Sequence, residues 1–193
     1  LDPGTKGVEL RKLKKLGLKP MDINEIFLTD VRVPVDNVIG EVNKGWRNAL
    51  KTLDYERCCL SAVNVGAAQS CLDKVLTYTR EREQFGQKIA SFQLSRAKLA
   101  DMEMEIDAAR LLLYRSASLV DRGIPNNKES AVANLYSSEA YVRAALSGMR
   151  LMGGWGYLME FDMQRHFRDS KLAEIGGGTS EILRIVISRE LTK

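Results

Sequence analysis

The sequence has few of the patterns that mark membrane, secreted or zinc-binding proteins. It has no run of about 18 apolar residues, which a transmembrane helix needs. No basic segment followed by an apolar one stands near its beginning, so we expect no secretion signal. Its cysteines are few, odd in number and without C-x-x-C spacing: Cys58, Cys59 and Cys71. We therefore expect free thiols, no metal site, and a reducing compartment such as the bacterial cytoplasm or the mitochondrial matrix.

An excess of positive charge is confined to the beginning of the chain. The net charge is +4, and a basic cluster that includes Arg11, Lys12, Lys14 and Lys15 accounts for it. A short basic segment is usually a solvated strand or loop, so we expect no nucleic-acid partner. The chain begins at Leu1, in the middle of a pattern, and we expect it to be a fragment of a larger protein.

The first forty residues have the pattern of strands and loops. Residues 8–13 alternate imperfectly, and residues 25–33 are rich in β-branched and aromatic side chains until Pro34 ends the pattern. Two strands do not form a stable domain alone. We expect them to belong to a sheet whose other strands lie elsewhere.

After Gly45 the sequence has the period of amphipathic helices. Apolar residues recur every three or four positions. We predict long helices at 45–82, 92–122 and 127–152, a short one at 162–171, and a final one after a glycine break at 176–178. Short connections between long helices predict a mainly α protein with an up-and-down four-helix bundle. The expected helix caps are Ser91, Asn126, and Thr179 or Ser180.

The most specific pattern lies at residues 81–93, between the first two long helices. An arginine beside a bent, glycine-containing junction can bind a pyrophosphate through charge-assisted hydrogen bonds, and Arg82 is in that position. Phe85 could lie against a planar ring. On physical grounds alone, a helix-to-helix corner with a surface arginine is the favoured interpretation.

Taken with other motifs, this block resembles the acyl-CoA dehydrogenases, whose R-x-x-F-G-x-x-I-x-x-F-Q pattern it matches. Further matches follow in the family's order: the end of the middle β domain at 27–34, G-G-W-G-Y at 153–157, R-D-S-K at 168–171 and G-T-S-E at 178–181. The resemblance covers nearly the whole chain. It implies that residues 1–41 end a middle β domain and that residues 42–193 form a C-terminal four-helix domain.

The resemblance also implies that the protein binds FAD between the subunits of a dimer, usually within a dimer of dimers. One subunit would contact FAD through Arg82, Gln84, Phe85 and Gln93. Its neighbour would contact FAD through Arg150, Leu151, Met152, Gly153 and Gly154. The start of the last helix would lie near the flavin, through Thr179, Ser180 and Glu181.

The catalytic base of most acyl-CoA dehydrogenases stands just before the final Gly-Thr, where this chain has Gly177. A minority, such as the isovaleryl-CoA and long-chain enzymes, have it in a D-x-E-R pattern on the long helix, which residues 54–57 match. The resemblance thus implies that Glu56 removes the α-proton of an acyl-CoA thioester and that the Gly177 N–H binds the developing enolate. The residues expected to contact substrate are Asp54, Tyr55, Arg57, Gly176 and Gly177.

Other interpretations of these residues remain open. Glu56 could be an ordinary helix carboxylate paired with a lysine or arginine, Glu174 is a rival base, and His166 could have a chemical role. Small residues at 176 and 177 would leave room near the acyl α-carbon, which suits branched or longer chains.

Together these expectations describe an FAD-dependent acyl-CoA dehydrogenase that passes electrons to an electron-transferring flavoprotein. Two other functions are open: a DNA-binding or repair-associated relative that uses the basic cluster, and a flavin oxidase or monooxygenase on the same scaffold. We expect no membrane partner. The fragment alone is expected to be inactive, because most of the β domain is missing from it.

Overall fold

The fold was analysed in a computed structural model, which describes residues 1–193 except the side chain of Lys51. The chain divides into two compact units, Leu1–Thr52 and Leu53–Lys193. Each unit is described by itself. The expected boundary between a β segment at 1–41 and a helical domain at 42–193 stays a prediction.

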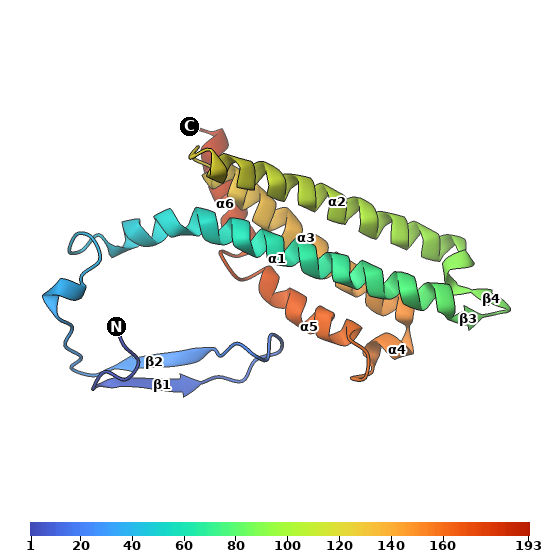
Figure 1. The fold of residues 1–193 in the computed structure, drawn as a ribbon, viewed down its shortest axis with the longest axis horizontal. Coiled ribbons are helices and arrows are strands. Elements are labelled where there is room, and N and C mark those ends of the chain that lie inside the picture. Colours follow the sequence, from blue (N-terminus) through green and yellow to red (C-terminus); the bar gives the residue numbers. More distant parts are fainter. The chain divides into compact units, whose positions relative to one another are not determined.

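The first unit contains one antiparallel pair of strands, β1 (Val8–Lys12) and β2 (Asn24–Leu28), labelled in Figure 1. Val8 pairs with Leu28 at one end of the ladder. The second strand ends earlier than the predicted residue 33, because Asp30 has a φ of 51°, which an extended strand does not allow. Four of the five β1 residues and all of β2 are exposed, so the pair builds no core of its own.

The basic cluster of this unit is partly neutralised by acidic neighbours. Lys12 pairs with Asp22 at 2.5 Å, and Arg11 pairs with Glu9 at 2.7 Å. The Arg11 guanidinium also lies 4.4 Å from the centre of the Phe27 ring. Two of the four named basic side chains thus have acidic partners within the hairpin.

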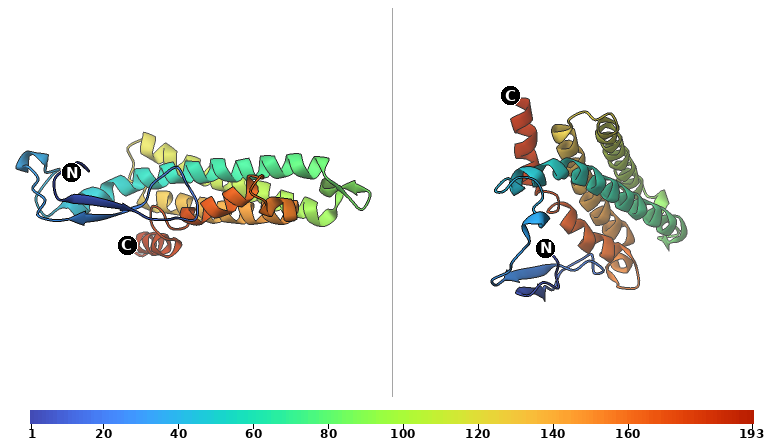
Figure 2. Two further views of the ribbon diagram at one scale, coloured as in Figure 1. Left: turned by 90° about the horizontal axis from the view of Figure 1, so that it is seen from below. Right: turned by 60° about the vertical axis from the view of Figure 1, so that its left-hand side comes forward.

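The second unit is an up-and-down bundle, which confirms the predicted mainly α fold. Its first helix, α1 (Gly45–Glu81), begins in the first unit and continues into the second. The elements that follow are β3 (Glu83–Gln84), β4 (Gln87–Lys88), α2 (Gln93–Asp121), α3 (Asn127–Met152), α4 (Gly154–Tyr157), α5 (Met163–Ala173) and α6 (Ser180–Leu191). Figure 1 shows the chain reversing direction from α1 to α2, from α2 to α3 and from α3 to α5. Figure 2 shows the three long helices side by side in two further views.

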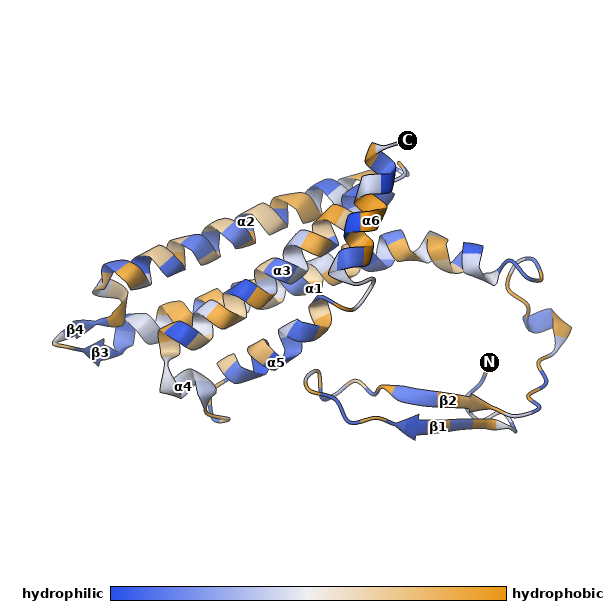
Figure 3. Cartoon of the chain, turned by 180° about the vertical axis from the view of Figure 1, so that it is seen from behind, coloured by the Kyte–Doolittle hydropathy of each residue, from blue (hydrophilic) through white to orange (hydrophobic). Residues whose placement is uncertain are grey.

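The core of the bundle lies where α1, α2, α3 and α5 meet. Its buried side chains include Leu72 and Val75 from α1, Ile106 from α2 and Met163 from α5. Most buried positions of α3 are alanine, serine or glycine, which lets its neighbours approach closely. A methyl group on Gly148 would lie 2.5 Å from the Met163 sulfur. Figure 3 shows hydrophobic and hydrophilic residues alternating along each long helix, as amphipathic helices require.

Helix ends follow the predictions only in part. The Thr179 side chain accepts a hydrogen bond from the Ile182 N–H at 3.3 Å and so caps α6, as predicted. The other predicted caps are wrong: α2 begins after Phe92 without a side-chain cap, and the Asn126 side chain donates to Ser116 instead of capping α3. The G-G-W-G-Y segment forms the single helical turn α4 after a Gly153 with φ 58°.

Candidate functional site

The predicted catalytic elements meet at one end of the bundle, around the side chain of Arg57. This guanidinium is only 5% exposed. Its Nε donates to the Gly177 carbonyl oxygen at 3.4 Å, and its Nη1 donates to Asn127 Oδ1 at 3.0 Å and to Asp54 Oδ1 at 3.5 Å. One side chain therefore joins α1, the first turn of α3 and the glycine break that lies 120 residues further along the chain. We call this region the glycine corner, defined by Gly176, Gly177 and Gly178.

The glycine corner has a backbone that only glycine adopts easily. Gly177 has a φ of 69° and Gly178 a φ of 114°. A methyl group on Gly177 would lie 2.5 Å from Leu60 Cδ1 and 3.2 Å from Asn134 Nδ2. The space beside Gly177 is thus already filled by α1 and α3. That glycine at 176 and 177 leaves room near the acyl α-carbon stays a prediction.

Asp54 lies in the same network, one turn before Arg57. Its carboxylate accepts a hydrogen bond from Ser130 Oγ at 3.4 Å. Partial burial raises the pKa of Asp54, although the Arg57 charge and the Ser130 hydrogen bond act in the opposite direction. Asn127 extends the network by donating to Glu190 Oε1 at 3.0 Å, which connects it to α6.

Glu56 lies beside this network but does not join it. Its side chain and that of Tyr55 are exposed, and no described residue forms a hydrogen bond or ion pair with the Glu56 carboxylate. Residues four apart lie on one face of a helix, so Glu56 stands one turn from Leu60, whose side chain contacts Gly177. The ordinary partner that would make Glu56 a simple helix ion pair is absent among the described residues.

The rival residues have structural partners. Lys171 forms an ion pair with Glu174, and the Glu174 carbonyl accepts from the Ser180 N–H at 3.2 Å. His166 is 6% exposed on α5, and its Nδ1 lies 3.1 Å from the Tyr141 hydroxyl. Burial lowers the pKa of His166 and raises the pKa of Tyr141. Both rivals thus have structural contacts, although the buried His166 Nε2 has no hydrogen-bond partner among the described residues.

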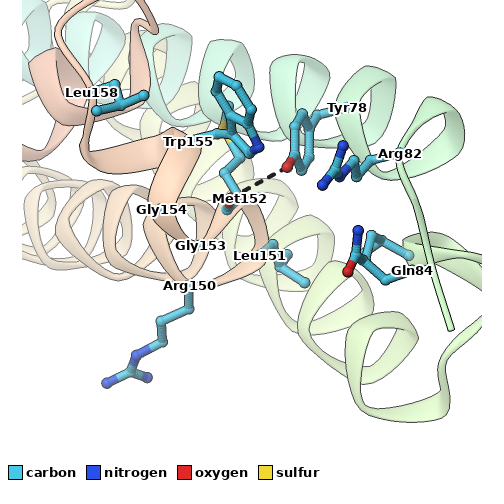
Figure 4. A pocket seen from close by; sticks show the side chains of 11 residues that line it. Tyr78, Arg82, Gln84, Arg150, Leu151, Met152, Gly153, Gly154, Trp155 and Leu158 are labelled. Carbon is cyan, nitrogen blue, oxygen red and sulfur yellow. Dashed lines mark hydrogen bonds between the residues drawn. The ribbon is translucent and has the colours of Figure 1, made fainter.

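At the other end of the bundle, a pocket of about 560 Å³ lies between the end of α1, the β3–β4 hairpin and α4. Figure 4 shows Arg82 and Gln84 facing it, with Tyr78 donating from its hydroxyl to the Met152 carbonyl at 3.4 Å. Leu151, Met152, Gly153 and Gly154 also line the pocket. The two segments, which the sequence analysis assigned to different subunits, thus line one pocket of a single chain. Their role in binding a cofactor stays a prediction.

The pocket suits a phosphate-bearing dinucleotide by its chemistry. Arg82 is exposed and supplies planar, charge-assisted donors. A methyl group on Gly153 or Gly154 would meet nothing within 4 Å, so the bare backbone is open to a ligand. The volume lies in the range of small-molecule sites. The residues present fit a part of FAD.

Arg150 also lines this pocket, although its side chain points away from Tyr78 and Arg82 in Figure 4. Two other residues predicted to bind the cofactor do not line it. Phe85, at the hairpin tip with φ 53°, is 94% exposed, and its ring packs edge-on against Phe92 with centroids 6.4 Å apart. Gln93 is exposed at the start of α2.

Sequence reasoning missed several residues of both sites. Tyr78 precedes Arg82 by four positions and so shares its helix face, a spacing that could have identified it. Trp155 and Leu158 line the same pocket and lie within or directly after a motif that was recognised. Asn134, in contrast, gave no signal, because a lone asparagine in a helix of alanines and serines has no distinctive pattern.

The remaining predicted group lies with the glycine corner. Thr179, Ser180 and Glu181 begin α6 and line a second hollow, of about 380 Å³, with Arg184 and Lys171. The 25 residues from Arg57 to Arg82 correspond to about 38 Å of α-helix, at ~1.5 Å per residue. The predicted cofactor residues of one chain are therefore divided between the two ends of its bundle.

The described residues form neither a membrane-spanning helix nor a metal-binding cluster. No described helix is both long enough and apolar enough to cross a membrane. Among the described residues, histidine, cysteine, aspartate and glutamate form no group of three or more that could hold a metal ion.

Comparison with known proteins agrees with this geometry. A family model described as "Acyl-CoA dehydrogenase, C-terminal domain" matches residues 43–192. The probable acyl-CoA dehydrogenase YngJ of Bacillus subtilis is 48% identical over 179 residues, which cover 93% of this chain and 47% of that protein. The mitochondrial isovaleryl-CoA dehydrogenase of Solanum tuberosum is 42% identical over 183 residues, which cover 95% of this chain and 44% of that protein.

A solved structure shares the fold closely. Butyryl-CoA dehydrogenase from Megasphaera elsdenii superimposes with a TM-score of 0.97 at 35% identity, over 100% of this chain and 51% of that one. The chain spans about half the length of the curated relatives that it matches. The match of the family model to most of the chain shows that the chain belongs to the acyl-CoA dehydrogenase family.

Proposed function

We propose that this chain is part of an FAD-dependent acyl-CoA dehydrogenase that introduces an α,β double bond into an acyl-CoA thioester. The observation that carries the proposal is the contact of Arg57 and Leu60 with Gly177. It brings the D-x-E-R segment of α1 to the glycine that replaces the usual base. In this proposal the carboxylate that is missing at position 177 is supplied by Glu56, which lies one helical turn from Leu60.

The reaction requires a base for the α-proton and a donor for the thioester carbonyl. In this proposal the Glu56 carboxylate takes the α-proton, and the Gly177 N–H donates to the carbonyl oxygen as negative charge develops there. No hydrogen bond within the described residues engages that N–H. FAD, when bound, accepts the hydride that leaves the β-carbon.

Arg57 would act by fixing the glycine corner. Its guanidinium donates to the Gly177 carbonyl and to Asn127, so it holds residue 177 against the start of α3. A corner of glycines has much conformational freedom, and a buried, multiply bonded arginine restricts it. The Glu56 side chain is exposed and is therefore accessible to the substrate. Bound substrate would surround the carboxylate, which no described residue of this chain does.

The division of cofactor residues between the two ends of the bundle favours an oligomer. About 38 Å of helix separates Arg57 from Arg82, at ~1.5 Å per residue. We propose that Arg82, Gln84 and residues 151–154 complete a site of another subunit, while Thr179, Ser180 and Glu181 serve the site of their own. An electron-transferring flavoprotein is the proposed electron acceptor, and the acyl-CoA is left open in chain length and branching.

Replacement of Glu56 by glutamine tests the proposed base. The side chain is exposed, so Glu56→Gln in the intact protein should leave the fold and FAD content unchanged and abolish bleaching of the flavin by a panel of acyl-CoAs. The matched control is Glu103→Gln, an exposed glutamate on α2, which should bleach normally. If an acyl-CoA that the unmodified protein oxidises bleached the flavin of Glu56→Gln to the same extent, Glu56 would be rejected as the base.

A further inference from the structure

Asn134 is an unpaired polar side chain in the interior of the bundle. It is 0% exposed, and neither Nδ2 nor Oδ1 has a hydrogen-bond partner among the described residues. A buried polar group without a partner lowers stability, and most buried amides in proteins are paired. A leucine of similar size would avoid that cost. Stability therefore does not explain an asparagine at this position.

The neighbours of Asn134 on the same side of α3 are paired. Asn64 Nδ2 donates to Ser137 Oγ at 3.4 Å, and Ser137 Oγ donates to the Asn134 carbonyl at 3.3 Å. Ser130, one turn earlier, donates to Asp54 Oδ1 at 3.4 Å. The row of polar residues between α1 and α3 is thus satisfied on both sides of Asn134, and only its amide is not.

The unpaired amide lies against the glycine corner. The position that a Gly177 methyl group would occupy is 3.2 Å from Asn134 Nδ2. Leu60 closes the same space from α1, at 2.5 Å from that position. Arg57, also on α1, donates to the Gly177 carbonyl. The amide is therefore a buried polar group without a partner beside a backbone segment that has no side chains of its own.

We propose that Asn134 is a positioning residue for the dehydrogenation, which rests on the function proposed above. Its amide supports Gly177 from the α3 side and fixes the direction of the Gly177 N–H toward the thioester carbonyl. Misplacement of a catalytic donor by about 1 Å can reduce the rate on the order of 100-fold. The unpaired amide is thus a cost in stability that the reaction requires.

Replacement of Asn134 by leucine separates this role from a structural one. In the intact, FAD-loaded protein, Asn134→Leu should melt at the same temperature as the unmodified protein or higher. Its kcat should fall by on the order of 10- to 100-fold, with KM and FAD content little changed. The flavin spectrum on addition of a non-reactive acyl-CoA analogue should also differ from that of the unmodified protein. A kcat equal to that of the unmodified protein would overturn the proposal.

Two further variants keep the test decisive. Ser116→Ala removes a buried polar group of α2 that accepts from Asn126, so it should lower the melting temperature and leave kcat unchanged. If Asn134→Leu does not fold, Asn134→Ala takes its place, with the same expected loss of kcat. Normal turnover in Asn134→Leu together with an inactive Glu56→Gln rejects only the role of Asn134. The reverse result rejects the proposed base and keeps the role of Asn134.

Discussion

A methyl group at Gly177 should destabilise the bundle far more than one at a glycine in open space. The φ of 69° costs a non-glycine residue roughly 1–2 kcal/mol. The added carbon would also lie 2.5 Å from Leu60 Cδ1, and such overpacking costs roughly 1–3 kcal/mol. We therefore expect Gly177→Ala to lower the free energy of unfolding by about 2–5 kcal/mol, the sum of the two effects.

The two contributions can be measured separately by urea unfolding followed by the helical circular dichroism signal. Gly86 has a φ of 77° and open space around it, so Gly86→Ala should show the backbone cost alone, roughly 1–2 kcal/mol. In a Leu60→Ala background the Leu60 clash is removed while Asn134 Nδ2 stays 3.2 Å away, so the cost of Gly177→Ala should fall toward that of Gly86→Ala. Equal costs for Gly177→Ala and Gly86→Ala in the unmodified background would refute the described packing of the glycine corner.

Two other substitutions test the pocket and the buried histidine. Arg82→Ala should weaken FAD retention by about tenfold or more without lowering the melting temperature of the apoprotein, since charge-assisted hydrogen bonds contribute roughly 1.5–3 kcal/mol; Arg80→Ala, an exposed arginine outside the pocket, should retain FAD. Burial holds the pKa of His166 below 6.5, so the unfolded chain binds a proton that the folded chain does not, and stability should fall as the pH drops below about 6.5. His166→Gln should reduce that loss, and an NMR titration of this single histidine with a midpoint at or above 6.5 would contradict its described environment.

The helices could be predicted because their physical signals are local. Apolar residues at intervals of three and four placed all three long helices within a few residues of their observed bounds. The cap of α6 was predicted as Thr179 or Ser180, because a hydroxyl residue directly after glycines and before an apolar run is typical of a helix N-terminus; Thr179 is the one that caps. Asn126 failed as a cap because a partner from another helix, Ser116, competes for its side chain. Such competition depends on tertiary packing, which a local pattern does not contain.

The candidate sites were predictable only where several motifs supported one another. The D-x-E-R segment and the bare Gly177 gave a hypothesis of spatial contact, and Arg57 and Leu60 make that contact. The sequence did not predict that Arg57 connects three elements. Its partners are Asn127 and the backbone carbonyl of Gly177, and neither belongs to a recognisable motif. The exposure of Phe85 also escaped prediction, since a hairpin tip and a buried corner have the same composition.

The small residues of α3 restrict how this protein can vary. This helix contacts α2, α4, α5 and α6, and its buried face consists largely of alanine, serine and glycine. At Gly148 even one added carbon would meet Met163 and Val75. A substitution there can rarely be compensated at a single neighbouring site, because it displaces two helices at once. We therefore expect substitutions to accumulate most slowly on the inner face of α3 and faster on the outer faces of α1 and α2.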